Sequence, residues 1–80
     1  MTREKRPFVA LGFASTHDAL DAETLLADMG IDVVPIPAPQ SISAGCGMAL
    51  RLTPDEEARA EKYLSGAGIV IRARVDILDV

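Results

Sequence analysis

The chain has 80 residues, 49% of them apolar, and we expect a single domain over residues 1–80 whose basic first six residues are flexible. Its formal net charge of −4 argues against nucleic acid as a partner, because phosphate binding needs a concentrated basic surface. No apolar run is long enough to span a bilayer and no signal-peptide core follows the basic start, so we expect a cytoplasmic protein without a membrane partner.

The first half begins with an apolar run and a helical pattern. Residues 7–13 have the length and composition of a strand. Residues 15–30 carry apolar side chains at helical spacing. Ser15 or Thr16 can cap the first turn of this helix, and Gly30 is a natural end for it.

A second strand, a loop and a third strand come next. Residues 31–36 form the second strand, and Pro35 makes it an edge strand because proline has no backbone N–H to donate. Residues 37–47 are rich in Pro, Ser and Gly and predict a loop. Residues 48–53 alternate apolar positions and predict the third strand.

The start of the second helix has a distinct capping pattern. Thr53 is the expected N-cap, Pro54 suits the first helical position, and Glu56 completes a capping box. The helix runs to Gly68, and residues 68–78 form the fourth strand. The resulting order, β-α-β-β-α-β, predicts an α+β ferredoxin-like sandwich. It has a four-stranded antiparallel sheet with two helices on one face.

Alternation along the strands assigns side chains to the two faces of this sheet. The side expected beneath the helices carries Val9, Leu11, Phe13, Met48, Leu50, Leu52, Ile69 and Ile71. The opposite side carries Phe8, Ala10, Gly12, Ala49, Arg51, Val70, Arg72 and Arg74. A solvated face is the favoured interpretation. The alternative is a docking surface for a partner or for a second subunit, in which Arg51, Arg72 and Arg74 would take part.

The single cysteine, Cys46, precedes the third strand. One thiol cannot form an internal disulfide or a multi-thiolate metal site, and one histidine gives no zinc site, so we expect neither metal nor cofactor. In the predicted topology the start of the third strand lies beside the end of the first. Cys46 would therefore approach the turn at residues 14–17, where the helix N-terminus stabilises a thiolate.

Other residues around this turn have two interpretations each. Thr16 and Ser15 add hydroxyl donors, and Gly45 and Gly47 leave the thiol uncrowded. Further possible contributors are His17 and Ser43. His17 is either a base for Cys46 or an exposed residue of the first turn, and the exposed residue is favoured. Ser43 either binds an anion or caps a turn, and Cys46 itself is either reactive or a small buried hydrophobe.

Four segments together resemble a known family. They are the Ser-Thr-His-Asp-Ala turn of residues 15–19, the Gly-Ile pair of residues 30–31, the Ile-Pro-Ala-Pro segment of residues 36–39 and the Ile-Ser-Ala-Gly-Cys-Gly-Met-Ala-Leu-Arg block of residues 42–51. Over residues 8–75 the chain resembles the putative selenium/sulfur carrier protein-like family. Gln40 departs from the family pattern, in which this position is usually arginine, and this difference affects how an anionic sulfur or selenium species would be held.

The resemblance implies a carrier in which Cys46 holds a persulfide or selenopersulfide and hands it on. Such a protein is a carrier rather than a turnover enzyme and needs no bound cofactor. Its implied partners are a sulfur or selenium donor, such as a cysteine desulfurase, and an acceptor protein. The alternative is a non-catalytic ferredoxin-like module that binds a partner or a small anion, with Cys46 used only for packing. An acylphosphatase-like hydrolase is disfavoured because such sites need an asparagine and the chain has none.

Overall fold

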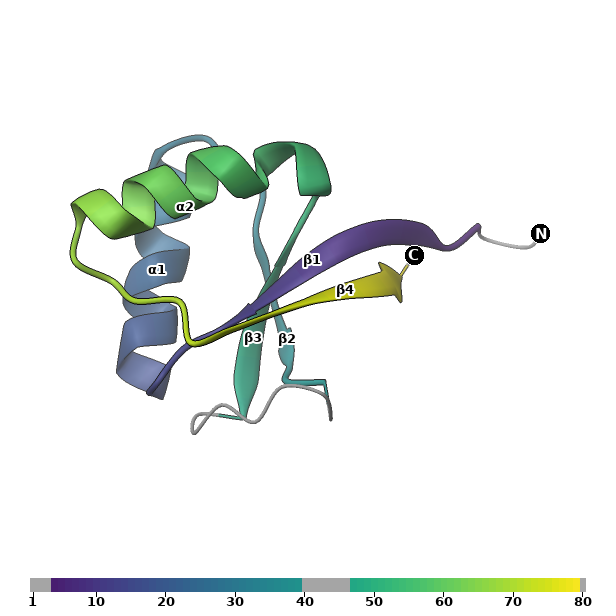
Figure 1. Ribbon diagram of the computed structural model, residues 1–80, viewed down its shortest axis with the longest axis horizontal. Helices are drawn as coiled ribbons and strands as arrows, with labels where there is room; N and C mark the ends of the chain where they lie inside the picture. Colours follow the sequence, from purple (N-terminus) through teal and green to yellow (C-terminus); the bar gives the residue numbers. More distant parts are fainter. Residues whose placement is uncertain (1–3, 40–46, 80) are drawn as a thin grey trace.

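A computed structural model describes residues 4–39 and 47–79. Figure 1 shows the order of elements: β1 (Arg6–Gly12), α1 (Thr16–Asp28), β2 (Val34–Pro37), β3 (Met48–Leu52), the 3-10 turn η1 (Pro54–Glu56), α2 (Glu57–Gly66) and β4 (Ala73–Asp79). The order confirms the predicted β-α-β-β-α-β arrangement of an α+β, ferredoxin-like fold.

The strands form one antiparallel sheet in the order β2-β3-β1-β4. The register runs from Val9 opposite Leu52 to Gly12 opposite Ala49, so β3 lies beside β1 as predicted. Pro35 lies in β2 at one edge of the sheet, which confirms its edge assignment. The strand β4 forms the other edge and pairs with the whole of β1.

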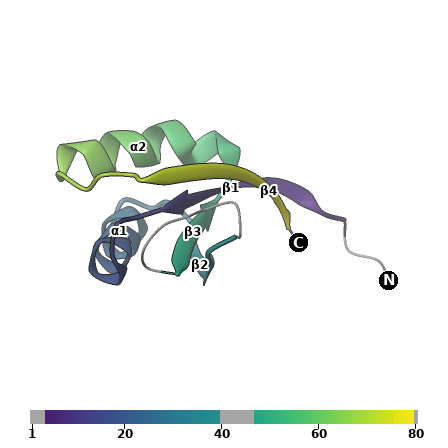
Figure 2. The ribbon, with the colours of Figure 1, turned by 60° about the horizontal axis from the view of Figure 1, so that its bottom comes forward.

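The core lies between the helices and one face of the sheet. Its fully buried members come from both helices, from β1 and the residue that follows it, and from β3. They include Val9, Leu11, Phe13, Ala22, Leu26, Leu50, Ala60 and Leu64. Burying this apolar surface is the main favourable term that holds the two layers together. In the turned view of Figure 2, α2 lies above β4 and α1 lies at the left.

Both helices end in the same way. The amide of Ile31 donates to the carbonyl of Leu26 at 2.9 Å, and the amide of Ile69 donates to that of Leu64 at 2.9 Å. Gly30 and Gly68 precede these isoleucines with φ of +79° and +76°. These are Schellman caps, in which glycine adopts the left-handed conformation and the next apolar residue returns to the core. The repeated Gly-Ile pair of the sequence is therefore a repeated helix stop.

The start of α2 differs from the prediction. The predicted capping box is absent, since Thr53 makes no side-chain hydrogen bond to the helix, and the α-helix begins at Glu57 after η1. The carboxylate of Glu56 instead accepts a hydrogen bond from Arg59 at 2.7 Å. A charge-assisted bond of this kind is stronger than a neutral one, and the 3-10 turn places Glu56 within reach of Arg59.

The fourth strand is shorter than predicted, and its alternation is shifted. Ile71 packs against the core beneath the helices, whereas Ala73 packs against Ala10 on the opposite face. Residues two apart in a continuous strand would share a face, so the chain changes faces between these positions. The predicted strand over residues 68–78 is wrong in its first part, because Gly68 to Arg72 connect α2 to β4 outside the ladder.

Candidate functional site

The N-terminus of α1 is fixed by Ser15. Ser15 has an extended backbone, and its Oγ accepts a hydrogen bond from the Asp18 amide at 3.1 Å. Its carbonyl accepts from the Ala19 amide at 3.1 Å. Of the two predicted caps, Ser15 is the one used. Because its oxygen accepts this bond, its own O–H remains available as a donor.

Two amides in the first turn of α1 point to anion stabilisation. Within the described part of the chain, the structure gives no acceptor to the amides of Thr16 and His17. Such amides carry the positive end of the helix dipole. The side chain of Thr16 is exposed beside them. An anion placed at this helix end would meet N–H donors together with the hydroxyl groups of Ser15 and Thr16.

The ring of His17 is turned along the helix surface. Its Nε2 lies 3.3 Å from Oδ2 of Asp21, and the two side chains are 84% and 56% exposed. This is an ordinary pair between positions i and i+4 of a helix. The arrangement agrees with the favoured prediction of an exposed first-turn residue.

Gly47 is the first described residue after the segment that contains Cys46. It has φ of +68°, and a Cβ added there would meet no atom within 4 Å. The structure therefore requires glycine at this position for its backbone conformation and not for close packing. The Gly47 carbonyl accepts a hydrogen bond from the Ala38 amide at 3.0 Å, which joins the ends of β2 and β3. Ser43, Gly45 and Cys46 lie outside the described residues.

The sheet brings Gly47 and the start of α1 to one end of the molecule. Gly12, the last residue of β1, pairs with Ala49, two residues beyond Gly47. Three residues after Gly12 the chain reaches Ser15 and α1. In Figure 1 the beginning of α1 lies at the same lower end as the end of β2 and the beginning of β3. The predicted proximity of these two segments is thus present in their described parts.

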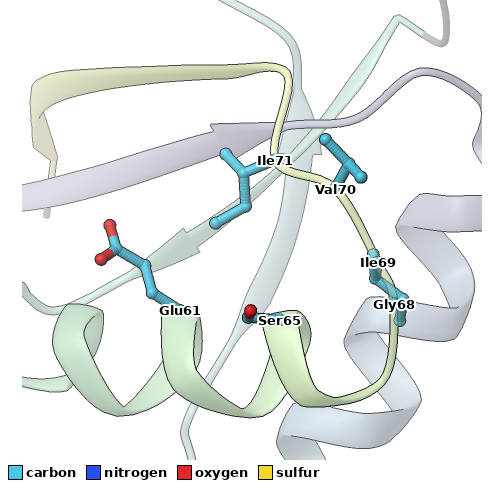
Figure 3. Close-up of a pocket in the computed structure, with 6 residues that line it drawn as sticks. All are labelled: Glu61, Ser65, Gly68, Ile69, Val70 and Ile71. Atoms are coloured by element: carbon cyan, nitrogen blue, oxygen red, sulfur yellow. The ribbon is translucent and has the colours of Figure 1, made fainter.

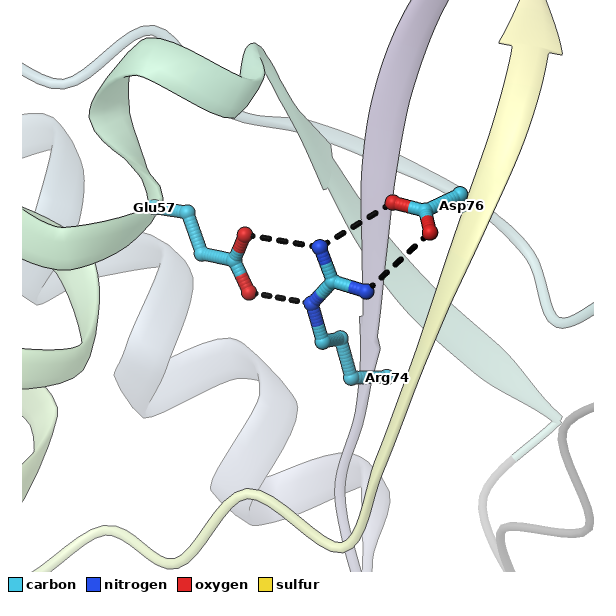
Figure 4. Close-up of polar contacts among 3 residues, drawn as sticks. All are labelled: Glu57, Arg74 and Asp76. Carbon is cyan, nitrogen blue, oxygen red and sulfur yellow. Dashed lines mark hydrogen bonds and ion pairs between the residues drawn. The ribbon is translucent and has the colours of Figure 1, made fainter.

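The predicted surface of three arginines is not formed. Arg74 pairs with Leu11, so it lies on the helix face of the sheet and not on the opposite face. There it donates to both carboxylate oxygens of Glu57 and also contacts Asp76 (Figure 4). Arg72 precedes β4, where its amide donates to Gly12. The predicted face of Arg74 is wrong because the alternation shifts before Ala73. Val70, also predicted on that face, lies in the segment before β4 and is 57% exposed.

Arg51 alone of these arginines lies in a strand on the predicted face. Its guanidinium carbon lies 4.3 Å from the centre of the Phe8 ring, and its Nη1 donates to Oδ2 of Asp79 at 2.7 Å. With 19% of its side chain exposed, this guanidinium is largely committed to contacts within the chain. The cluster therefore argues against a free arginine surface for anions.

The face opposite the helices is apolar instead of basic. Ala10 and Ala49 are fully buried at its centre, and the partly buried side chains around them are Ile36, Ala38, Ala73, Val75 and Ile77. Sequence reasoning missed the contribution of β4, although Ala73, Val75 and Ile77 alternate in the sequence with charged residues. The face on which these three residues lie could be assigned only after the first residue of β4 was known.

A cavity of about 300 Å³ lies between α2 and the segment that leads into β4. Figure 3 shows Glu61 and Ser65 on the helix side and the segment from Gly68 to Ile71 on the other. None of these residues belongs to the predicted site. The described residues contain no cluster of His, Cys, Asp and Glu suited to a metal ion, and none of their helices could cross a membrane.

A comparison with protein families shows the family of this chain. The sequence profile described as "Putative Se/S carrier protein-like" matches residues 9–75. The chain belongs to this family. The match begins within β1, ends within β4 and includes both the cap of α1 and the segment with Cys46. Neither the curated proteins nor the solved structures that were searched gave a match.

Proposed function

We propose that this member of the Se/S carrier-like family holds a sulfur or selenium atom on Cys46 and transfers it between two proteins. The observation that carries the proposal is the position of Gly47. This residue is bonded to Cys46 in the sequence and lies at the same end of the sheet as the N-terminus of α1. The family description supports the cargo.

The groups proposed to stabilise the thiolate are the two first-turn amides that have no acceptor among the described residues and the hydroxyls of Ser15 and Thr16. A helix N-terminus lowers the pKa of a nearby thiol by favouring its anion. The His17 ring would assist only after it leaves Asp21. Ser43 and Gly45 are proposed to provide a hydroxyl donor and access to the thiol.

The transfer step is proposed to be a thiolate attack on a donor persulfide. The Cys46 thiolate bonds to the outer sulfur of the donor, the donor S–S bond breaks, and the donor leaves as a thiolate. The chain then carries an S–SH group, and an acceptor thiolate removes the outer sulfur by the same step. The oxidation states balance without an added oxidant. A donor that carries selenium in the outer position would load an S–SeH group in the same manner.

The proposed partners follow from this chemistry: a donor that generates a persulfide, such as a cysteine desulfurase, and an acceptor that uses the sulfur or selenium. The role is that of a carrier and not of a turnover enzyme. A cytoplasmic setting is proposed because a reducing compartment keeps a lone thiol available for loading.

The first test is the pH dependence of Cys46 alkylation by iodoacetamide, measured in the folded and in the denatured chain. We expect the folded thiol to react with a pKa clearly below the denatured value, because the N-terminus of α1 favours the thiolate. A folded pKa at or above the denatured one, or reaction only after unfolding, would contradict the proposal. The second outcome would favour a packing role for Cys46.

The second test is loading by a small-molecule persulfide donor, followed by intact mass measurement. The wild-type chain should gain one sulfur that a reducing agent removes, and Cys46→Ser should gain none. The chain has no other cysteine, so background labelling of a second thiol is absent. Equal loading of both proteins would refute the carrier function.

A further inference from the structure

The two edges of the sheet differ in their capacity to add another strand. In β2 the edge is blunted by Pro35 and Pro37, which have no N–H to donate. The opposite edge, β4, has seven residues and contains neither proline nor glycine. Within the described residues, β4 pairs only with β1. A long edge of this kind presents a row of free backbone groups to another strand.

The side chains of β4 form a self-complementary pattern. Arg74 and Asp76 lie on the helix face, on either side of Val75. When two copies of β4 pair antiparallel about a two-fold axis through Val75, Arg74 of each copy stands opposite Asp76 of the other. Opposite charges at directly opposed positions of an antiparallel pair attract, and their Cβ atoms lie about 5 Å apart. The side chain of Asp76 lies 3.0 Å from Arg74 of its own chain but is 75% exposed, so it is also accessible to a second copy.

Other registers of the same pairing are disfavoured. An axis through Arg74 would place Arg74 against itself, and an axis through Asp76 would place Asp76 against itself. Like charges that face each other directly destabilise a strand pair. An axis through Ile77 would place Asp76 opposite Leu78 and lose the attraction. The charge pattern thus selects a single register from those near the middle of the strand.

The apolar side chains of β4 fit the same register. Ala73, Val75 and Ile77 lie on the face opposite the helices. About an axis through Val75, the two valines meet, and each Ala73 meets the Ile77 of the other copy. Cross-strand pairs of β-branched residues stabilise antiparallel sheets. An axis normal to the sheet also keeps the helices of both copies on the same side, so the apolar faces continue across the junction.

We propose that two copies of this chain associate through their β4 edges into a continuous antiparallel sheet, with Arg74 of each copy paired with Asp76 of the other. The interface is isologous, since the same strand is used by both copies. It is distinct from the surface of three arginines expected from the sequence.

The test is sedimentation of the full chain with two charge reversals, used alone and mixed. In Asp76→Arg, Arg74 faces an arginine in the register described, and in Arg74→Asp, Asp76 faces an aspartate. Each variant alone should dimerise about tenfold or more weakly than the wild type, from the loss of two attractive pairs and the gain of two repulsive ones. An equimolar mixture should recover association, because every pair across the junction is then of opposite sign.

Asp32→Arg is the matched control, since it makes the same change in net charge at an exposed residue outside β4. It should dimerise as the wild type does. A wild-type chain that remains monomeric up to about 1 mM would overturn the proposal, because such an association would be weaker than about −4 kcal/mol. Equal weakening by Asp32→Arg, or an undiminished dimer of Asp76→Arg, would also overturn it.

A second measurement is needed if Arg74→Asp unfolds because residue 74 no longer donates hydrogen bonds to Glu57. Hydrogen exchange of the wild-type chain, followed as a function of protein concentration, should show amides of β4 becoming more protected while amides of β2 do not change. Protection that rises at β2, or at neither edge, would contradict association through β4.

Discussion

Ser15 connects the stability of α1 with the chemistry proposed for its first turn. Its hydroxyl oxygen satisfies the Asp18 amide, while the amides of Thr16 and His17 have no acceptor in the described residues. The cap thus holds the helix end in place without using up its donors. At the scale of single residues, the side chain of Ser15 caps the helix, and the neighbouring backbone amides are left to stabilise an anion.

Replacing Ser15 with Ala should reduce the free energy of unfolding by about 1 kcal/mol, because the Asp18 amide loses its acceptor. Ser15→Asp should retain the stability, since a carboxylate also caps the helix. Under the carrier proposal its negative charge should raise the pKa of Cys46 above the wild-type value. Denaturant unfolding and the pH dependence of alkylation measure the two effects. A Ser15→Asp chain that is as stable as the wild type and has an unchanged thiol pKa would show that this end of α1 does not affect Cys46.

Gly47 shows why residue type alone does not reveal the use of a glycine. From the sequence, its absent side chain suggests space around a thiol. In the structure, its left-handed backbone turns the chain into β3, and the surrounding space is open. The two explanations call for the same residue, and only the backbone conformation separates them.

At the scale of elements, the two helices are terminated by one device used twice. In each, a left-handed glycine allows the following isoleucine amide to reach a carbonyl five residues earlier. Ile31 and Ile69 then join the core beneath the helices. The cap therefore sets both where the helix ends and where the next segment enters the core.

Gly68→Ala should destabilise the chain by about 1 kcal/mol, because alanine in the left-handed conformation is strained. Gly66→Ala is the matched control, two residues earlier and helical, where alanine should stabilise by up to about 1 kcal/mol. A Cβ at either position meets no atom within 4 Å, so packing does not confuse the comparison. Thermal unfolding of the two variants should give shifts of opposite sign. Equal destabilisation by Gly68→Ala and Gly66→Ala would show that the left-handed cap at Gly68 is not the cause of the lost stability.

At the scale of the whole molecule, an ion pair joins the helical layer to an edge of the sheet. Arg74 of β4 donates to both carboxylate oxygens of Glu57 at the start of α2 (Figure 4). Hydrogen bonds from Arg74 hold the pKa of Glu57 below its ordinary value, and the same bonds raise the pKa of Arg74. The side chain of Glu57 is 18% exposed, so the pair is partly shielded from solvent.

This pair gives stability a defined pH dependence. Because the folded pKa of Glu57 is lowered, its contribution is fully present above the ordinary value of 4.5 and is lost as the pH falls through the lower folded value. Glu57→Gln should therefore be less stable than the wild type near pH 7, and the difference should shrink near pH 3. Urea unfolding at several pH values measures it. Glu23→Gln on α1 is the control, since the structure gives Glu23 no ion-pair partner among the described residues. The difference in stability between this variant and the wild type should not shrink at low pH. A constant difference for Glu57→Gln would mean that the pair does not form in solution.

The sequence by itself determined the order of elements, the family and the residue types of the candidate site. These depend on local signals: the spacing of apolar residues in 15–30, the serine cap, the Gly-Ile stops and the single thiol. Each is fixed by backbone hydrogen bonding or by periodicity within a few residues. The edge position of β2 also followed locally, because Pro35 lacks a donor wherever the strand lies.

The tertiary structure alone decided where the charged side chains of β4 point and how α2 begins. Alternation assigns faces only relative to a starting residue, and the chain changes faces between Ile71 and Ala73. A shift of one residue turns every side chain of a strand to the other side, so Arg74 reaches Glu57 and not the opposite face. The capping box is absent for a related reason, because the carboxylate of Glu56 is bonded to Arg59, whose guanidinium also donates to the carbonyl of Met29 at the end of α1. Face and partner depend on what packs nearby, and that is set by contacts between residues far apart in the sequence.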